Sequence, residues 1–192
     1  SDYETAAIKG SVKFPEILGW ISRFKPSGDL FEVGCGMGYF LEYARTQGYA
    51  VSGIEYAELG TRTSREKFGL DVRRGSFEEL APEPEQHDVI FMGDVLEHLT
   101  QPLEMLTKAH TMLKTSGIVA LEVPSTFNSL AGRFAVTGMR LLRTKKKMKL
   151  PPYHVNEFTP KTLRSIIQRA GFREAVIIQR IKPPSAITLR GS

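Results

Sequence analysis

Three glycines and one acid near the start of the chain have the types and the spacing to hold a ligand. Gly34, Gly36 and Gly38 follow an apolar run and precede a helical pattern. Glycine has no Cβ, so the chain can turn sharply there and a ligand can touch its backbone. Glu55 ends the next apolar run, at the spacing of roughly 20 residues from which an acid accepts hydrogen bonds from ribose hydroxyls. The set predicts a site for a ribose-bearing cofactor, and the simpler interpretation is a tight turn that binds nothing.

Glu32, two residues ahead of the first glycine, separates two classes of cofactor. The dinucleotide fingerprint is G-x-G-x-x-G, with a pyrophosphate at the following helix N-terminus. Here the spacing is G-x-G-x-G, and a carboxylate would repel a pyrophosphate but attract an ammonium group. The pattern therefore favours a cofactor with an amino-acid end. A nicotinamide-dependent oxidoreductase is the alternative, and a thermal-shift screen of both cofactors would separate the two.

These residues need a sheet to position them. Apolar, β-branched runs alternate with helical patterns, which predicts a doubly wound, Rossmann-like α/β fold with helices on both faces of a mostly parallel, seven-stranded sheet. The strands are expected at Leu30–Val33, Ala50–Ile54, Leu70–Arg73, Asp88–Met92, Ile118–Val123, Ala175–Ile181 and, as a short last one, Ala186–Leu189. The helices are expected at Pro15–Phe24, Gly38–Gln47, Ala57–Phe68, Pro102–Leu113 and Pro160–Ala170. Ligands bind such sheets beyond the carboxyl ends of the strands, which is where the glycine turn would lie.

Composition fits one domain over residues 1–192, with an N-terminal helical segment at 1–29. The 192 residues are 41% hydrophobic, enough for a sizeable core. No apolar run approaches the roughly 18 residues of a membrane helix, and the first residues lack the order of a secretory signal. Cys35 is the only cysteine, which excludes an internal disulfide and a multi-cysteine zinc site. We therefore expect a cytoplasmic protein.

Several stretches, taken in order, resemble the class I S-adenosylmethionine-dependent methyltransferases, closest to the small bacterial enzymes that methylate hydroxyls. The resemblance covers about Leu30 to Phe172. The stretches are "EVGCGMGYF", "GIE", "GSFEEL", "HDVIFMGDVLEHL", "LKTSGIVALEVPS" and "FTPKTLRSIIQRAGF". It implies S-adenosylmethionine as cofactor, S-adenosylhomocysteine as product, and a hydroxyl of a small molecule, sugar or lipid-linked compound as acceptor. A non-catalytic cofactor-binding module of the same fold is a further alternative.

The resemblance also implies which residues bind the cofactor. The first turn would hold the methionine part, Glu55 the ribose, the third turn the adenine edge, and the fourth turn would lie beside the reacting methyl group. The implied set is Glu32, Gly34, Cys35, Gly36, Gly38, Glu55, Tyr56, Ser76, Phe77, Gly93, Asp94 and Val95. Many relatives carry an Asp after the third strand, where this chain has Ser76 and Phe77.

A hydroxyl acceptor gains from a nearby base, and the candidates are His98, His154 and Asp94. Asp94, Glu97 and His98 also form an acid-x-x-acid-His pattern, similar to one that binds a divalent metal in some related O-methyltransferases. Residues at these spacings share one face of a helical turn. An ordinary histidine and acid at the start of a helix is the simpler interpretation, so we assign no metal. Full activity after exhaustive chelation would rule out the metal hypothesis.

The excess of positive charge is concentrated in one segment, within the long irregular region 124–152. The net charge is +5, and without the cluster the chain would be slightly acidic, so nucleic-acid binding by the whole domain is not indicated. The cluster is Arg133, Arg140, Arg143, Lys145, Lys146, Lys147 and Lys149. We interpret residues 133–149 as a lid whose cations suit an anionic acceptor; peripheral contact with a membrane surface and a solvated loop are the alternatives.

Overall fold

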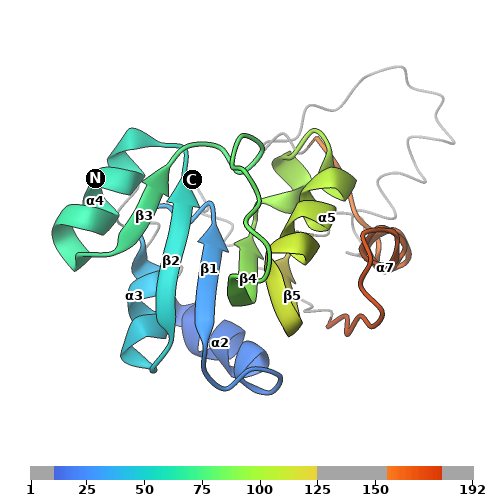
Figure 1. Cartoon of the computed structure of the whole chain (residues 1–192), viewed down its shortest axis with the longest axis horizontal. Coiled ribbons are helices and arrows are strands. Elements are labelled where there is room, and N and C mark those ends of the chain that lie inside the picture. The colour runs from blue at the N-terminus through green and yellow to red at the C-terminus, as the bar shows by residue number, and fades with distance from the viewer. Residues whose placement is uncertain (1–10, 125–154, 179–192) are drawn as a thin grey trace, which may run out of the picture.

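The computed structural model describes residues 11–124 and 155–178, and within them it contains an open, fully parallel sheet. Its strand order is β3-β2-β1-β4-β5 (Figure 1). The strands are β1 (Asp29–Val33), β2 (Ala50–Glu55), β3 (Asp71–Arg74), β4 (His87–Gly93) and β5 (Leu113–Glu122). The chain starts in the middle of the sheet, runs outward to β3 and then crosses to β4, so the order reverses between β1 and β4. Ligands of doubly wound sheets bind at such a reversal.

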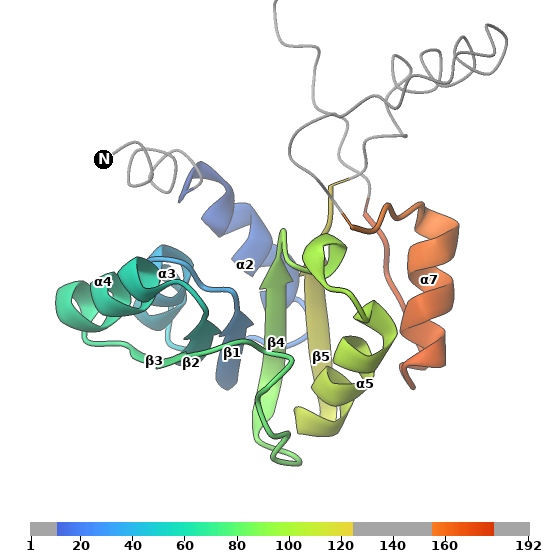
Figure 2. The same ribbon diagram turned by 90° about the horizontal axis from the view of Figure 1, so that it is seen from above.

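Helices cover both faces of the sheet, which gives three layers (Figure 2). On one face lie α2, α3 and α4, and on the other lies α5, with α7 packed against it. The helices are α2 (Phe14–Ser22), α3 (Tyr39–Thr46), α4 (Glu58–Phe68), α5 (Pro102–Met112) and α7 (Pro160–Arg169). Two short 3-10 helices, η1 (Ser11–Lys13) and η2 (Leu96–His98), precede α2 and follow β4.

The central strands carry apolar side chains on both faces, as a parallel sheet covered on both sides requires. In β4, Val89 and Phe91 belong to the core under α2 and α3, whereas Ile90 and Met92 belong to the core under α5 and α7. Alternate residues thus feed two separate cores. The sheet is therefore covered on both faces by packed helices, and the ends of its strands lie outside these two cores.

The order of the helices and the first five strands was predicted correctly, with ends that differ by a few residues. Two local signals in the sequence set helix ends. Gly69 ends α4 with a φ of 64°, and Thr159 caps α7, with its side chain accepting a hydrogen bond from the Thr162 amide. These signals act within one turn of chain, which is why the sequence shows them directly.

The prediction of seven strands is not met by the described residues, which form five. A strand was expected to begin at Ala175, but residues 175–178 have no strand structure, and Val176 and Ile178 are exposed. The rest of that stretch and the predicted strand at 186–189 lie outside the described residues, as do 1–10 and most of 124–152.

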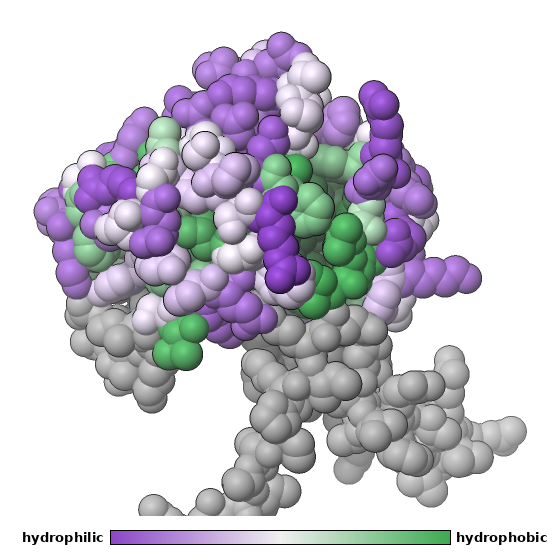
Figure 3. All heavy atoms as spheres, turned by 90° about the horizontal axis from the view of Figure 1, so that it is seen from below, coloured by the Kyte–Doolittle hydropathy of each residue, from purple (hydrophilic) through white to green (hydrophobic). Residues whose placement is uncertain are grey.

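The described surface is mixed in character. Seen from below, hydrophilic residues cover most of it, and apolar residues come to the surface in separate groups between them (Figure 3). None of the helices in the described parts of the chain combines the length and the apolar character that crossing a membrane requires.

Candidate active site

The first turn, between β1 and α3, has the backbone that its glycines predict. Gly34, Gly36 and Gly38 have φ values of 69°, 54° and 79°, all in the left-handed region. The Gly34 amide donates to the carbonyl of Ile54 at 2.8 Å, and the Gly38 amide donates to that of Cys35 at 2.9 Å. The turn is therefore closed on itself and anchored to the end of β2.

Two of these glycines serve different purposes. A Cβ added at Gly38 would lie 2.7 Å from Leu70 Cδ1 and 2.8 Å from Ser64 Cβ, so packing leaves no room for a side chain. A Cβ at Gly36 would meet no atom within 4 Å. The bare backbone at Gly36 therefore borders open space, where a ligand can approach it.

Glu32, near the carboxyl end of β1, is a buried carboxylate. It is only 7% exposed, and its Oε2 atom is buried without a hydrogen-bond partner among the described residues. Burial, and to a smaller extent the nearby charge of Glu55, raises the pKa of Glu32 to about 8. A buried acceptor without a donor is costly to leave in that state. The observation fits the ammonium group of an amino-acid ligand, which would supply both a donor and a positive charge.

Glu55, at the end of β2, is held by two backbone amides. Its Oε2 accepts from the Gly36 amide at 2.8 Å, and its Oε1 accepts from the Ala57 amide at 2.7 Å. A carboxylate has about four acceptor sites, so two remain for other donors such as ribose hydroxyls. The same bond that orients Glu55 joins it to the glycine turn. Tyr56, beside it, is 78% exposed.

The third turn follows β3 and is tied to Glu55. The Gly75 amide donates to the backbone carbonyl of Glu55 at 3.0 Å. The hydroxyl of Ser76 donates to a carboxylate oxygen of Glu78 at 2.7 Å and accepts from the Glu78 amide at 3.1 Å. Phe77 is 3% exposed and packs in the core under α5. Of the two residues predicted to frame adenine, Ser76 thus lies near the surface, and Phe77 can offer mainly its backbone.

The fourth turn, after β4, lies next to the first. A Cβ at Gly34 would be 2.8 Å from Val95 Cγ2, so these two turns are in contact. Asp94 is exposed and has a φ of 52°, and its amide donates to the carbonyl of Glu122 at 2.9 Å. Gly93 ends β4. The structure therefore brings the first and fourth turns together, because β1 and β4 are neighbours in the sheet.

The candidate bases lie around η2. The side chain of His98 is 46% exposed, and its Nε2 lies 3.8 Å from Oε1 of Glu97, which is buried. The carbonyl of Glu97 accepts hydrogen bonds from the amides of Val155 and Asn156 at 3.0 and 2.9 Å. Residue 155 is the first described residue after His154, which itself lies outside the described residues.

The three residues of the metal hypothesis are in different environments. Glu97 is buried, whereas Asp94 and His98 are exposed. Within residues 11–124 and 155–178 there is no group of three or more His, Cys, Asp or Glu side chains that could hold a metal ion. The need for a divalent ion stays a hypothesis, which a measurement of activity after exhaustive chelation would test.

Cys35 is buried inside the first turn. Burial, followed by the charges of Glu32 and Glu55, raises the pKa of its thiol far above its usual value. A thiol that stays protonated is a poor nucleophile. Its small size explains its presence in a turn that packs this closely.

Sequence reasoning missed two lysines that shape this edge. Lys13 forms an ion pair with Glu122 at 3.1 Å and so ties η1 to the end of β5. Lys108, on α5, donates to backbone carbonyls of the third turn. Their partners lie 109 and about 30 residues away in the chain, so no local pattern could have indicated them.

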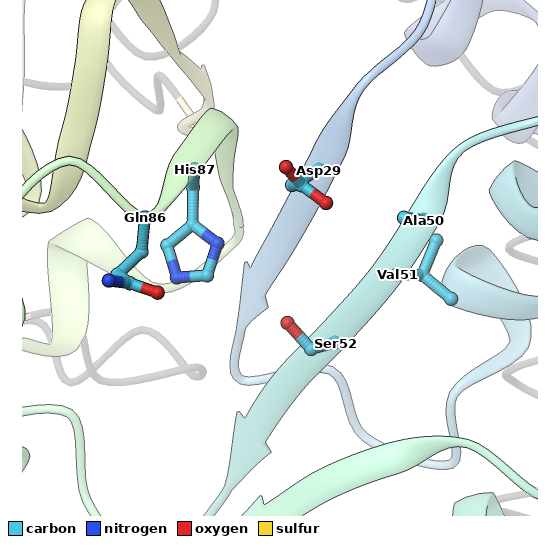
Figure 4. Close-up of a pocket in the computed structure, with 6 residues that line it drawn as sticks. All are labelled: Asp29, Ala50, Val51, Ser52, Gln86 and His87. Atoms are coloured by element: carbon cyan, nitrogen blue, oxygen red, sulfur yellow. The ribbon is translucent and has the colours of Figure 1, made fainter.

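A hollow of about 330 Å³ opens at the opposite end of the sheet from the glycine turn, where β1, β2 and β4 begin. In Figure 4, Gln86 and His87 lie on one side of it and Asp29 and Ser52 on the other. It is distant from the glycine turn, because it lies at the amino ends of the strands.

The open parallel sheet, the glycine turn at its reversal and the acid one strand away define a Rossmann-like nucleoside-binding enzyme. The methyltransferase domain family matches residues 13–175. The chain belongs to this family and is a class I S-adenosylmethionine-dependent methyltransferase, which decides between the two cofactor classes considered from the sequence.

Individual relatives agree with the family assignment. Over 179 residues the chain is 31% identical to a ubiquinone biosynthesis O-methyltransferase of Ruegeria pomeroyi, with 88% of this chain and 68% of that protein covered. In structure it is similar to an S-adenosylmethionine-dependent methyltransferase of Thermotoga maritima, with a TM-score of 0.68, 23% identity, and coverage of 90% and 77%. It also resembles phosphoethanolamine N-methyltransferase 2 of Haemonchus contortus, at a TM-score of 0.64 and 16% identity, covering 83% of this chain and 37% of that one.

Proposed function

We propose that the protein transfers a methyl group to a hydroxyl of a small molecule, and that the glycine turn and its two acids hold the cofactor. The observation that supports the placement most directly is Glu32, a buried carboxylate whose Oε2 lacks a donor among the described residues. An ammonium at this position would satisfy that oxygen. Glu32 lies next to a turn whose bare backbone borders open space at Gly36.

In this arrangement each turn has one task. Glu32 accepts from the ammonium of the methionine part, which lies against the backbone of residues 34–38. Glu55 accepts from the ribose hydroxyls with the acceptor sites that its two amide bonds leave available. Tyr56 and Ser76 border the adenine, with the backbone of Phe77 behind them.

The fourth turn lies beside the reacting methyl group in this proposal. Bound S-adenosylmethionine supplies a methyl group on a positively charged sulfur that is already activated for displacement. Gly93, Asp94 and Val95 line this side, and Val95 packs against the first turn at Gly34. His98 or Asp94 takes the proton of the acceptor hydroxyl as the oxygen attacks, and aligning the acceptor with the methyl group is the main contribution of the protein.

The choice of oxygen rests on the curated relatives. The relative from Ruegeria pomeroyi is named an O-methyltransferase, at 31% identity over most of this chain. The fold alone does not select the atom, since the similar structure from Haemonchus contortus is named an N-methyltransferase. A small phenol, a sugar or a lipid-linked hydroxyl are the acceptor classes to test. The anionic acceptor and the lid at 133–149 rest on the sequence, because that segment lies outside the described residues.

Two measurements test the proposal. Calorimetry should detect binding of S-adenosylhomocysteine, and a Glu32→Gln variant should lose most of it. Methyl-labelled cofactor should then transfer label to one of three acceptor panels: catechol-like phenols, phosphorylated sugars or primary amines. Label found only on amines would contradict the choice of oxygen. Binding without transfer to any of these panels would leave lipid-linked hydroxyls as the acceptor class to test next.

A further inference from the structure

Lys108, on helix α5, has an unusual set of partners. Its Nζ donates hydrogen bonds to three backbone carbonyls, those of Phe77 at 2.9 Å, Glu78 at 2.7 Å and Leu80 at 2.9 Å. It also lies 5.4 Å from the centre of the Phe77 ring. An ammonium has three donors and no acceptor, so these carbonyls use its full hydrogen-bonding capacity. Three carbonyls that converge on one point would repel one another without a cation between them.

The segment that Lys108 holds is the third turn of the site. At its start, the Gly75 amide is bound to the carbonyl of Glu55 at 3.0 Å. In its middle, the hydroxyl of Ser76 closes a local turn with Glu78. Residues 76–80 are therefore fixed between Glu55 on the sheet side and Lys108 on the helix side. A movement at either anchor would shift the position of Ser76.

The remainder of this connection has its own anchors. The amides of Glu85 and Gln86 donate to the carbonyls of Thr111 and Met112, at the end of α5, at 3.3 and 2.9 Å. These bonds do not involve Lys108. Removing its ammonium should therefore loosen residues 76–80 and leave the crossover to β4 in place.

We infer that Lys108 is a positioning residue for the adenine end of the cofactor, acting by holding the turn of residues 76–80. The inference rests on the proposed function, because that proposal puts adenine beside this turn. Lys108 acts through the turn's backbone and contributes no atom to methyl transfer.

The test compares two lysine variants in the full chain. Lys108→Met removes the ammonium and keeps most of the side-chain volume. Lys161→Met removes the charge of an exposed lysine on α7 and is the matched control. Calorimetry should show a dissociation constant for S-adenosylhomocysteine about tenfold higher for Lys108→Met, and within about twofold of wild type for Lys161→Met.

A rescue experiment separates positioning from general stability. In Lys108→Ala the three carbonyls remain and the ammonium is missing, so added n-propylammonium should restore at least threefold of the lost affinity. The same salt should leave the wild type and Lys161→Met unchanged. Because the salt would also restore any stability that the ammonium provides, the affinities are compared at a temperature at which circular dichroism shows Lys108→Ala fully folded.

The outcomes are distinguishable. If the wild type binds S-adenosylhomocysteine and Lys108→Met binds it equally well, the role of Lys108 is disproved. If the wild type itself does not bind, the proposed function fails. If the Lys108 variants do not fold, hydrogen exchange of the wild type decides: the ligand should slow exchange of the amides at 76–80, and unchanged exchange there would overturn the inference.

Discussion

The two ends of strand β1 both carry acids, but the surroundings of these acids differ. At the amino end, Asp29 and Asp88 share the ammonium of Lys114, and Asp88 also accepts the Asp29 amide at 3.0 Å. At the carboxyl end, Glu32 is buried beside Glu55, and no cation of the described residues pairs with it. In the folded chain the acids at the amino end are therefore paired with a cation, whereas Glu32 at the carboxyl end is not paired with one in the part of the chain that the structure describes.

The pKa values move in opposite directions for this reason. The Asp29 amide and the Lys114 ammonium lower the pKa of Asp88, whereas burial and the charge of Glu55 raise that of Glu32 to about 8. Strongly perturbed groups at the ligand-binding end of a sheet are typical of functional sites. The comparison teaches that an acid at a strand end indicates a site more strongly where folding leaves its charge without a cation than where a lysine already pairs with it.

The largest effects on ligand binding and on stability should come from replacing one acid at each end by its amide. Glu32→Gln removes the charge that faces the ligand's ammonium and should weaken binding of S-adenosylhomocysteine by about 2 kcal/mol or more, over about thirtyfold. It should not lower the free energy of unfolding, because Glu32 is costly to ionise in the free protein. Asp29→Asn should do the reverse, lowering stability and sparing binding. Calorimetry and urea unfolding measure both, and equal ligand affinity in the two variants would break the comparison.

The glycines sharpen the contrast within the carboxyl end. Gly38→Ala should lower the free energy of unfolding by about 1–3 kcal/mol through crowding of Leu70 and Ser64, in addition to about 1–2 kcal/mol for a left-handed residue. Gly36→Ala carries only the second cost and instead narrows the space for the ligand. Gly36→Ala should therefore be the more stable variant and the weaker binder. If urea unfolding shows Gly38→Ala to be the more stable variant, the assignment of Gly38 to the packed side and Gly36 to the open side of the turn is wrong.

The pH dependence of binding follows from Glu32. With a pKa of about 8, the Glu32 carboxyl is mostly protonated at neutral pH in the free protein. In the complex it would be ionised beside the ammonium of the ligand, so binding should release a proton. The dissociation constant should fall as pH rises from about 6 to 8, by at most about tenfold per unit, and then level off. Because the folded pKa lies above the ordinary value of 4.5, the stability of the free protein should decrease as pH rises between 4.5 and about 8. Calorimetry in buffers of different ionisation enthalpy counts the proton, and Glu32→Gln should abolish its release.

The smallest effect is expected at the amino end. Lys114→Met leaves Asp29 and Asp88 facing each other and should slightly lower the unfolding temperature at neutral pH. The folded pKa of Asp88 is lowered, so its stabilising contribution is present at neutral pH and is lost as pH falls below about 4. The difference from wild type should vanish there. Binding of S-adenosylhomocysteine should be unchanged, and a clear loss would mean that the two ends are coupled.

The sequence predicted most of the fold because the relevant signals are local. The apolar runs of β1 and β4, the apolar spacing in the helices and the cap at Thr159 each act within a few residues. The glycine turn and Glu55 were predicted as a pair because one strand and one helix separate them in any sheet of this type. The strand expected at Ala175–Ile181 has no strand structure in its described part, residues 175–178.

By itself the sequence determined the order of the elements and the class of cofactor, and it singled out the two acids proposed to face that cofactor, since these depend on residue type and short spacing. Only the tertiary structure decided the surroundings of each acid. Lys114 lies 85 residues from Asp29, and Lys108 lies about 30 residues from the carbonyls it holds. Burial and charge pairing depend on which distant segments the sheet brings together, and for that reason the isolation of Glu32 became visible only in the folded chain.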